Sequence, residues 1–277
     1  MLDKLIHKTL KVPYRLNFSH RLVKGSAISL VLIHGLGASE NMWHDLIERL
    51  PKDLDIITVD LIGFGSSPQP EWDAYDLETQ ARAVRNTLVW ARARKQIIVC
   101  GHSLGSLVGI EMAALYPSLI NQLILCSPPI YKRPIGRSKS SLYTKGLKRF
   151  YHDVINNQGP IGSVIELASK HGLIYEGFDV NEKTMPAFFE TLQTAIINQD
   201  SYSHLQALKL PTKIIYGLLD PLLVTENFKL AAQQNSVITL IKVPASHHIL
   251  GFFEVKLTDV IIESIAKITK TATIKIK

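Results

Sequence analysis

The chain of 277 residues has few cysteines and no long apolar run, and both absences narrow its class. Its two cysteines, Cys100 and Cys126, lie at the ends of apolar stretches, which predicts buried reduced thiols rather than a disulfide or a metal pair. No uninterrupted hydrophobic stretch approaches the roughly 18 residues of a membrane span. Residues 1–20 break their apolar pattern with Lys8 and Lys11, so they are not expected to be a secretory signal. These features predict a cytoplasmic protein.

Several motifs of cofactor and nucleic-acid chemistry are also missing. There is no C-x-x-C, H-E-x-x-H or P-loop pattern, so neither a metal nor another cofactor is expected. The formal charge is +7 and the pI about 9.3, which would suit an acidic partner. No nucleic-acid-binding motif accompanies that charge, so no nucleic-acid partner is expected. Residues 132–149 hold seven Lys or Arg and no acid, and we interpret them as a solvated face, with weak contact to an anionic surface as the alternative.

The most informative motif is the pentapeptide GHSLG at residues 101–105. It follows an apolar run at 96–100 and precedes a helical pattern over 106–116, which Pro117 ends. A strand that turns sharply into a helix through G-x-S-x-G is a nucleophile elbow, which holds the hydroxyl of Ser103 at the tip of the turn. The alternative is a glycine-rich turn with an incidental serine.

An earlier loop supplies what a reactive serine needs in front of it. The apolar strand predicted at 29–33 runs into His34-Gly35-Leu36-Gly37, a glycine-rich turn that can point a backbone N–H toward the serine. Together with the N–H of Leu104 it would form a two-donor oxyanion hole. We expect the histidine that begins this turn to order the loop.

Two later strand ends carry the remaining groups. The apolar strand at 213–216 leads into G-x-x-D, which ends at Asp220, and the strand at 237–243 leads into a loop with His247 and His248. A serine hydroxyl is a poor nucleophile until a neighbouring base, usually histidine, takes its proton. The order serine, aspartate, histidine, each after a strand, is the order of an elbow-type catalytic triad.

In combination these motifs resemble those of the α/β-hydrolases, in particular the monomeric, capped esterase and lipase-like group. The resemblance extends from the strand at 29–33 to the helix after His248, and includes the Asp60-Leu61-Ile62-Gly63-Phe64-Gly65 stretch. It implies that Asp60 shapes the loop at 63–67 and is not the triad acid. The resemblance also implies that Ser103 is the nucleophile and that Asp220 is the triad acid. It implies that the two oxyanion donors are the backbone N–H groups of Leu36 and Leu104.

The histidine loop departs from the family pattern. Such loops usually have glycine just before the catalytic histidine, and here that position holds His247. Counting from Pro244 identifies His248 as the base. Glu254 lies six residues beyond His248, one more than the commonest family spacing, so His247 remains the alternative.

The periodicity predicts an α/β fold. Strand and helix patterns alternate from 29 to 127, including a helix at 76–94 with one apolar stripe, and this alternation is typical of a parallel sheet covered on both faces. Residues 11–19 add an antiparallel strand or two at the edge. We expect a mostly parallel sheet of the eight-stranded type, flanked by helices and carrying a helical cap. The core would comprise residues 1–129 and 208–277, and the cap residues 130–207.

The predicted activity follows from the triad. We expect a serine hydrolase that cleaves an ester, thioester or lactone of a small or medium acyl substrate through an acyl-enzyme. Haloalkane dehalogenases and epoxide hydrolases of similar pattern need an aspartate at the elbow, so Ser103 argues against them. Carbon–carbon bond hydrolases, perhydrolases and acyltransferases share the triad and remain alternatives, as does a non-catalytic ligand receptor.

Overall fold

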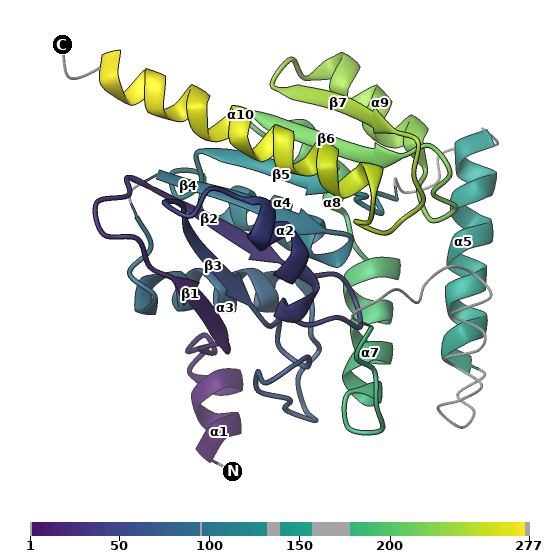
Figure 1. Ribbon diagram of the computed structural model, residues 1–277. Coiled ribbons are helices and arrows are strands. Elements are labelled where there is room, and N and C mark those ends of the chain that lie inside the picture. The colour runs from purple at the N-terminus through teal and green to yellow at the C-terminus, as the bar shows by residue number, and fades with distance from the viewer. Residues whose placement is uncertain (1, 95, 132–138, 157–177, 275–277) are drawn as a thin grey trace.

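The computed structural model describes residues 2–94, 96–131, 139–156 and 178–274 (Figure 1). Within them seven strands form one sheet in the order β1-β3-β2-β4-β5-β6-β7. Only the edge strand β1 is antiparallel to its neighbour, and every other pairing is parallel. The strands are β1 (Phe18–Arg21), β2 (Ile28–Ile33), β3 (Asp55–Val59), β4 (Gln96–His102), β5 (Gln122–Cys126), β6 (Thr212–Gly217) and β7 (Ile238–Val243).

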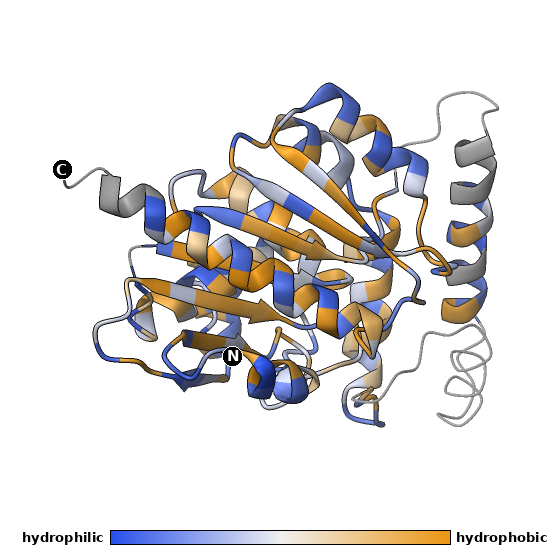
Figure 2. Ribbon diagram, turned by 45° about the horizontal axis from the view of Figure 1, so that its top comes forward, coloured by the Kyte–Doolittle hydropathy of each residue, from blue (hydrophilic) through white to orange (hydrophobic). Residues whose placement is uncertain are grey.

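Helices cover both faces of the sheet (Figure 1). Because β2, β3 and β5 are buried along their whole length, alternate side chains feed two separate cores. Val31 and Val99 pack with α3 and α4, whereas Leu30 and Ile98 pack with α2 and α10 on the other face. The helices nearest the sheet are α2 (His44–Arg49), α3 (Leu77–Trp90), α4 (Leu104–Leu115), α8 (Ser201–Ala207), α9 (Thr225–Gln234) and α10 (Phe252–Ile274). Figure 2 shows the apolar strands and the alternating polar and apolar turns of α10.

Helix α3 illustrates how local sequence sets an element. Its N-cap, Asp76, accepts a hydrogen bond from the N–H of Thr79 at 2.7 Å, which satisfies one of the free donors of the first turn. Its predicted apolar stripe is buried. The helix ends at Trp90, earlier than the predicted 94, because Arg92 adopts a left-handed conformation with φ of 54°.

The β1 edge has one antiparallel strand. Residues 11–17, which were expected to pair at this edge, instead run along α3. The side chain of Asn86 donates to the carbonyls of Pro13 and Tyr14, and the hydroxyl of Thr87 accepts from the N–H of Leu16. Backbone groups that bond to helix side chains are not available for a strand ladder, so the sheet has seven described strands where the eight-stranded type was expected.

The described elements between β5 and β6 are helices, as the expected cap requires. They are α5 (Lys139–Asn156), α7 (Met185–Thr191), η3 (Leu192–Ile197) and α8. Although α8 lies inside the stretch predicted as cap, it contacts α4 and α9 of the core. Of the basic cluster predicted at 132–149, Lys132, Arg133 and Arg137 lie outside the described residues. The other four members of the cluster, Lys139, Lys145, Lys148 and Arg149, are residues of α5.

Two further expectations concern the cysteines and the membrane. Cys100 and Cys126 are free thiols and both are buried, as predicted, with their sulfur atoms 3.9 Å apart. Burial raises the pKa of the Cys126 thiol well above its usual value, so that thiol stays protonated. Among the described helices, none combines the length and the apolar character that crossing a bilayer would require. The remaining described elements are short helices: α1 (Leu2–Lys4) and η1 (Leu5–Thr9) at the N-terminus, and η2 (Glu40–Trp43) before α2.

Candidate active site

Ser103 lies at the sharp turn between β4 and α4. Its backbone adopts φ 51° and ψ −113°, a region that costs a non-glycine residue about 1–3 kcal/mol. Two hydrogen bonds hold this turn. The N–H of Ser103 donates to the carbonyl of Cys126 at 2.8 Å. The hydroxyl of Ser106 donates to the carbonyl of Gly101 at 2.7 Å. The strained conformation predicted for a nucleophile elbow is therefore present at this serine.

The two flanking glycines are required by close backbone approach. A Cβ atom on Gly101 would lie 2.2 Å from the carbonyl oxygen of Gly105. One on Gly105 would lie 2.2 Å from the carbonyl oxygen of Ile33, at the end of β2. Since neither neighbour is the movable end of a side chain, only glycine fits at either position.

The loop after β2 passes directly beside the elbow. A Cβ atom on Gly35 would lie 2.8 Å from Nδ1 of His102 and 3.4 Å from Cβ of Ser103. The N–H of Ala38 donates to the carbonyl of Gly35, which forms a tight turn. Among the residues that the structure describes, no acceptor bonds to the N–H of Leu36 in this turn. Leu104 is the first residue of α4, so its N–H has no acceptor within the helix. The two predicted oxyanion donors thus lie on the loop and the helix end that border Ser103.

His34 fixes the start of this loop. Its Nδ1 lies 2.8 Å from the carbonyl oxygen of Gly35, and its Nε2 accepts from the N–H of Leu61 at 2.9 Å. These partners define a neutral ring with the proton on Nδ1. Complete burial lowers the pKa of His34, which keeps the ring in that form. His34 therefore orders the loop, as expected.

The segment of the cap just before α7 touches the same loop. The N–H of Asp179 donates to the carbonyl of Gly37 at 2.7 Å. Gly37 has φ of 74°, and a Cβ atom there would lie 2.5 Å from the ring of Phe178. Phe178 in turn meets Phe188 of α7 edge to face, with ring centroids 6.0 Å apart. The loop after β2 and the cap are thus in direct contact.

The carboxylate of Asp60 forms hydrogen bonds to neighbouring loops. Its carboxylate accepts from the side chain of Asn17 at 2.9 Å and from the backbone N–H groups of Glu40 and Ser66 at 2.7 and 2.9 Å. A Cβ atom on Gly65 would lie 2.3 Å from this carboxylate. Asp60 therefore shapes the loop at 63–67, as the resemblance implied.

The partner of Asp220 is His247. Nδ1 of His247 lies 2.7 Å from Oδ2 of Asp220, while Oδ1 accepts from the N–H of Leu222 at 2.9 Å. Both side chains are at least nine-tenths buried. The expectation that His248 would pair with this aspartate is wrong: the structure forms the alternative.

The local backbone explains the shift by one residue. The N–H of Ala245 donates to the carbonyl of Val243, a turn of three residues that shortens the loop after β7. The carbonyl of Ala245 then accepts from Leu219, and a Cβ atom on Gly217 would lie 2.3 Å from it. The loop is therefore pressed onto the end of β6, where the residue that reaches the carboxylate is His247.

His102 connects the elbow to the histidine loop. Its Nε2 lies 2.9 Å from the backbone carbonyl oxygen of His247, and the two rings have centroids 5.0 Å apart. Burial, and next the neighbouring His247, lower the pKa of His102, so the ring is neutral and Nε2–H is the donor. Sequence reasoning identified this residue only as the variable position of the elbow, because its partner is 145 residues away.

His248 lies beside the pair. Its ring centroid is 6.1 Å from that of His247, with the two planes at 81°. Partial burial, followed by the proximity of His247, lowers the pKa of His248. The described residues thus bring Ser103, His102, His247 and Asp220 to one edge of the sheet, with His248 adjacent.

The alpha/beta hydrolase fold family matches residues 28–254 of this chain. The chain therefore belongs to that family. Among solved structures, the esterase EaEST from Exiguobacterium antarcticum superposes with a TM-score of 0.69 at 18% identity, covering 91% of this chain and 95% of that one. At that identity the likeness concerns the fold.

The names of two relatives of similar sequence refer to acyl groups. A protein of Xenopus laevis named monoacylglycerol lipase abhd6-A is 26% identical over 76% of this chain and 66% of its own length. A protein of Rattus norvegicus named 1-acylglycerol-3-phosphate O-acyltransferase ABHD5 is 33% identical over 42% of this chain. That second match spans about a third of the rat protein.

Proposed function

We propose that the chain is a serine hydrolase that cleaves an ester, thioester or lactone of a small or medium acyl substrate through an acyl-enzyme. The observation that carries this proposal is the buried hydrogen bond between Asp220 and His247. The loop of His247 is in turn hydrogen-bonded to His102, the residue next to Ser103. A strained serine, a histidine oriented by a carboxylate, and two backbone N–H groups are the parts that acyl transfer to serine requires.

Each residue has a defined step. Because Nδ1–H of His247 donates to Asp220, its Nε2 carries the lone pair that takes the proton from Ser103 as the hydroxyl oxygen attacks the substrate carbonyl. The N–H groups of Leu36 and Leu104 stabilise the oxyanion, aided by the positive end of α4. The imidazolium then protonates the leaving group. A water attacks the acyl-enzyme, gives its proton to the same nitrogen, and releases the acid and the free serine.

The relatives support acyl chemistry and supply one rival. The name of the Xenopus protein describes hydrolysis of an acylglycerol, and its similarity covers most of this chain. The name of the rat protein describes acyl transfer, which would use the same acyl-enzyme with an alcohol replacing water. Product analysis with and without an added lysophospholipid separates the two, because only the transferase makes a new ester.

The test combines a substrate series with active-site labelling. The wild type is assayed on p-nitrophenyl esters of graded chain length and on lactones, alongside Ser103→Ala. The variant should fold and lose about 10³-fold or more of the turnover, since triad members act as a unit. A fluorophosphonate should label the wild type at Ser103 and spare the variant. Labelling at another serine, or unchanged turnover in Ser103→Ala, contradicts the proposal.

A further inference from the structure

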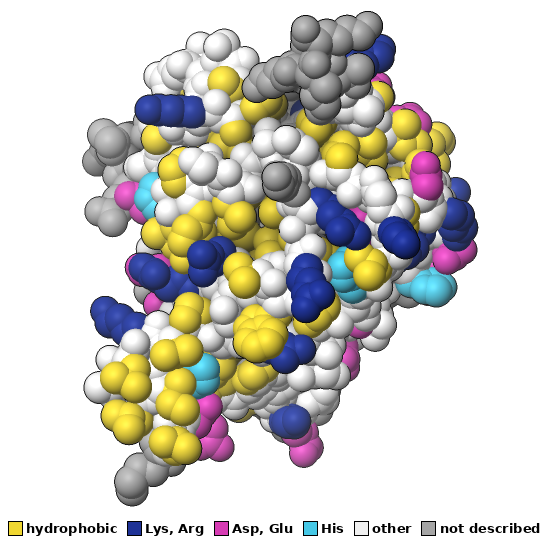
Figure 3. All heavy atoms as spheres, turned by 90° about the vertical axis from the view of Figure 1, so that its left-hand side faces the viewer, with side chains coloured by type: hydrophobic (Ala, Val, Ile, Leu, Met, Phe, Trp, Pro, Cys, Tyr) yellow, Lys and Arg dark blue, Asp and Glu magenta, His cyan; other side chains and the backbone are white. Residues whose placement is uncertain are grey.

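One face of the molecule exposes large hydrophobic side chains far from the candidate active site. We call it the N-terminal face, made of residues 2–24 and of residues 85–94 at the end of α3. Figure 3 views it and shows hydrophobic side chains over the N-terminal segment and across the same face, interspersed with Lys and Arg. The exposed residues are Leu2, Leu5, Leu10, Val12, Leu22, Val89 and Trp90, each between 46 and 69% exposed.

Hydrogen bonds and ring contacts join the two segments into one surface. The guanidinium of Arg15 lies 4.9 Å from the ring centroid of Trp90. Farther along, the guanidinium of Arg94 donates to the carbonyl of Val23 at 3.1 Å. The side chain of Asn86 bonds to the chain just before Arg15. The hydrophobic groups therefore sit on a continuous platform.

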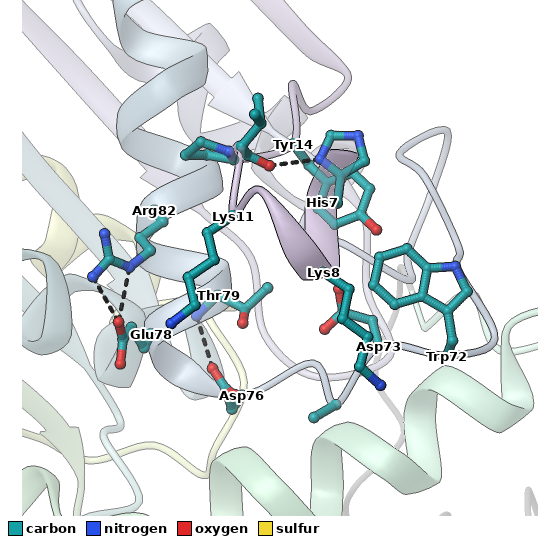
Figure 4. Close-up of a pocket in the computed structure, with 13 residues that line it drawn as sticks. His7, Lys8, Lys11, Tyr14, Trp72, Asp73, Asp76, Glu78, Thr79 and Arg82 are labelled. Carbon is teal, nitrogen blue, oxygen red and sulfur yellow. Dashed lines mark hydrogen bonds and ion pairs between the residues drawn. The ribbon is translucent and has the colours of Figure 1, made fainter. Parts of the chain in front are cut away.

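The platform is fixed to the core. The ring of His7 stacks on that of Tyr14 with centroids 3.8 Å apart, and Tyr14 is only 4% exposed. Figure 4 shows this stack beside Lys8, Lys11 and Trp72. All of them line a cavity of about 340 Å³. The N-terminal segment is thus docked through the stack of His7 on Tyr14, whereas Leu2, Leu5 and Leu10 stay exposed.

The charged residues of these two segments are almost all positive, although the cavity beside them is also lined by Asp73, Asp76 and Glu78. Residues 2–24 contain six Lys or Arg against one acidic residue, Asp3, and residues 85–94 contain three Arg and no acid. Lys4, Lys8 and Lys11 are exposed, and within the described part of the chain no carboxylate lies at ion-pair distance from them. Leucines interleaved with unpaired lysines are the composition of a helix that lies in a membrane interface.

We propose that the N-terminal face docks on the surface of an anionic lipid bilayer. The leucines and Trp90 would enter the interfacial layer, where an indole beside a guanidinium is well accommodated, and the lysines would pair with anionic headgroups. Nucleic acid would use the charge but not the exposed leucines, so the bilayer accounts for both features. This inference does not depend on the proposed hydrolase activity.

The experiment measures co-sedimentation of the full chain with vesicles of phosphatidylcholine, and with vesicles of equal parts phosphatidylcholine and phosphatidylglycerol. Lys4, Lys8 and Lys11 are changed together to Gln. The matched control changes three exposed lysines at the opposite, β7 side of the molecule to Gln: Lys209, Lys229 and Lys242. A second variant, Leu5→Ser with Leu10→Ser, tests the apolar side and has Ile262→Ser on α10 as its control. Circular dichroism checks that every variant folds.

We expect the wild type to sediment with the anionic vesicles and to be released by salt. The lysine variant should lose at least about tenfold in vesicle affinity, whereas its control should change less than about twofold. The leucine variant should weaken binding to anionic vesicles as well. The proposal is overturned if the wild type ignores phosphatidylglycerol, or if each variant and its control respond alike. It is also overturned if the same lysines govern binding to duplex DNA but not to vesicles, or if the leucine variant abolishes only self-association in analytical ultracentrifugation.

Discussion

His102 and His247 are joined by a hydrogen bond of 2.9 Å from an imidazole Nε2 to a backbone carbonyl, although 145 residues separate them. One of them adjoins Ser103 and the other holds Asp220. The position of the proposed base relative to the proposed nucleophile is therefore set by a third side chain that belongs to neither role.

The first prediction distinguishes the two adjacent histidines. His247→Ala should lose about as much turnover as Ser103→Ala, roughly 10³-fold or more, because the carboxylate of Asp220 orients its ring. His248→Ala should lose much less. Both are measured as kcat on the best p-nitrophenyl ester, with fluorophosphonate labelling as a second readout. If His248→Ala is the inactive variant instead, the base is His248 and the prediction is contradicted.

The second prediction concerns the bridge from the elbow. His102→Phe keeps a ring but leaves the buried carbonyl of His247 without its donor, so kcat should fall about tenfold with KM little changed. His102→Gln, which can still donate, should recover part of the loss. A purely structural role would lower the free energy of unfolding of both variants without this split between kcat and KM.

The third prediction uses the elbow glycines. Gly105→Ala places a Cβ atom 2.2 Å from a backbone oxygen and should reduce the free energy of unfolding by several kcal/mol. Gly146→Ala in α5 meets nothing within 4 Å and should stabilise the protein by about 0.5–1 kcal/mol. Urea denaturation measures both. Equal effects at the two positions would mean that the close approach at the elbow is relieved by a small backbone shift.

The fourth prediction is a pH dependence of stability. Burial lowers the pKa of His34 and of His102 in the folded state, whereas both should titrate near 6.5 when unfolded. The unfolded chain therefore binds more protons as the pH falls below about 6.5, and the free energy of unfolding should drop by up to about 1.4 kcal/mol per pH unit for each histidine. His102→Gln should flatten this slope. A slope that is the same in the variant would exclude His102 as a contributor.

Much of the sheet and of the site was predictable from the sequence because the signals are local. The strands β2 to β5 are mostly apolar runs, α3 has a cap and a stripe, and the elbow has its two glycines in place. The order of Ser103 and Asp220 along the chain predicted their common edge. Apart from that chain order, each of these features is determined by residues that are close in the sequence.

The misses depend on contacts between distant segments. The choice of His247 over His248 follows from a turn that presses onto β6 at Gly217, a constraint that counting from Pro244 does not include. The antiparallel edge strand expected from residues 11–19 begins only at Phe18, because the residues before it bond to Asn86 and Thr87, more than seventy residues away. No local pattern encodes either partner.

The contact between residues 178–180 of the cap and the loop after β2 limits how this scaffold can diversify. Because Asp179 bonds to the carbonyl of Gly37 and Phe178 occupies the space beside that glycine, an exchanged cap must retain a matching segment between α5 and α7. A graft that replaced residues 178–180 would disturb the loop after β2 as well. In laboratory recombination, a productive cap exchange should therefore keep residues 178–180 of this chain, so that the cap helices change while the loop keeps its contacts.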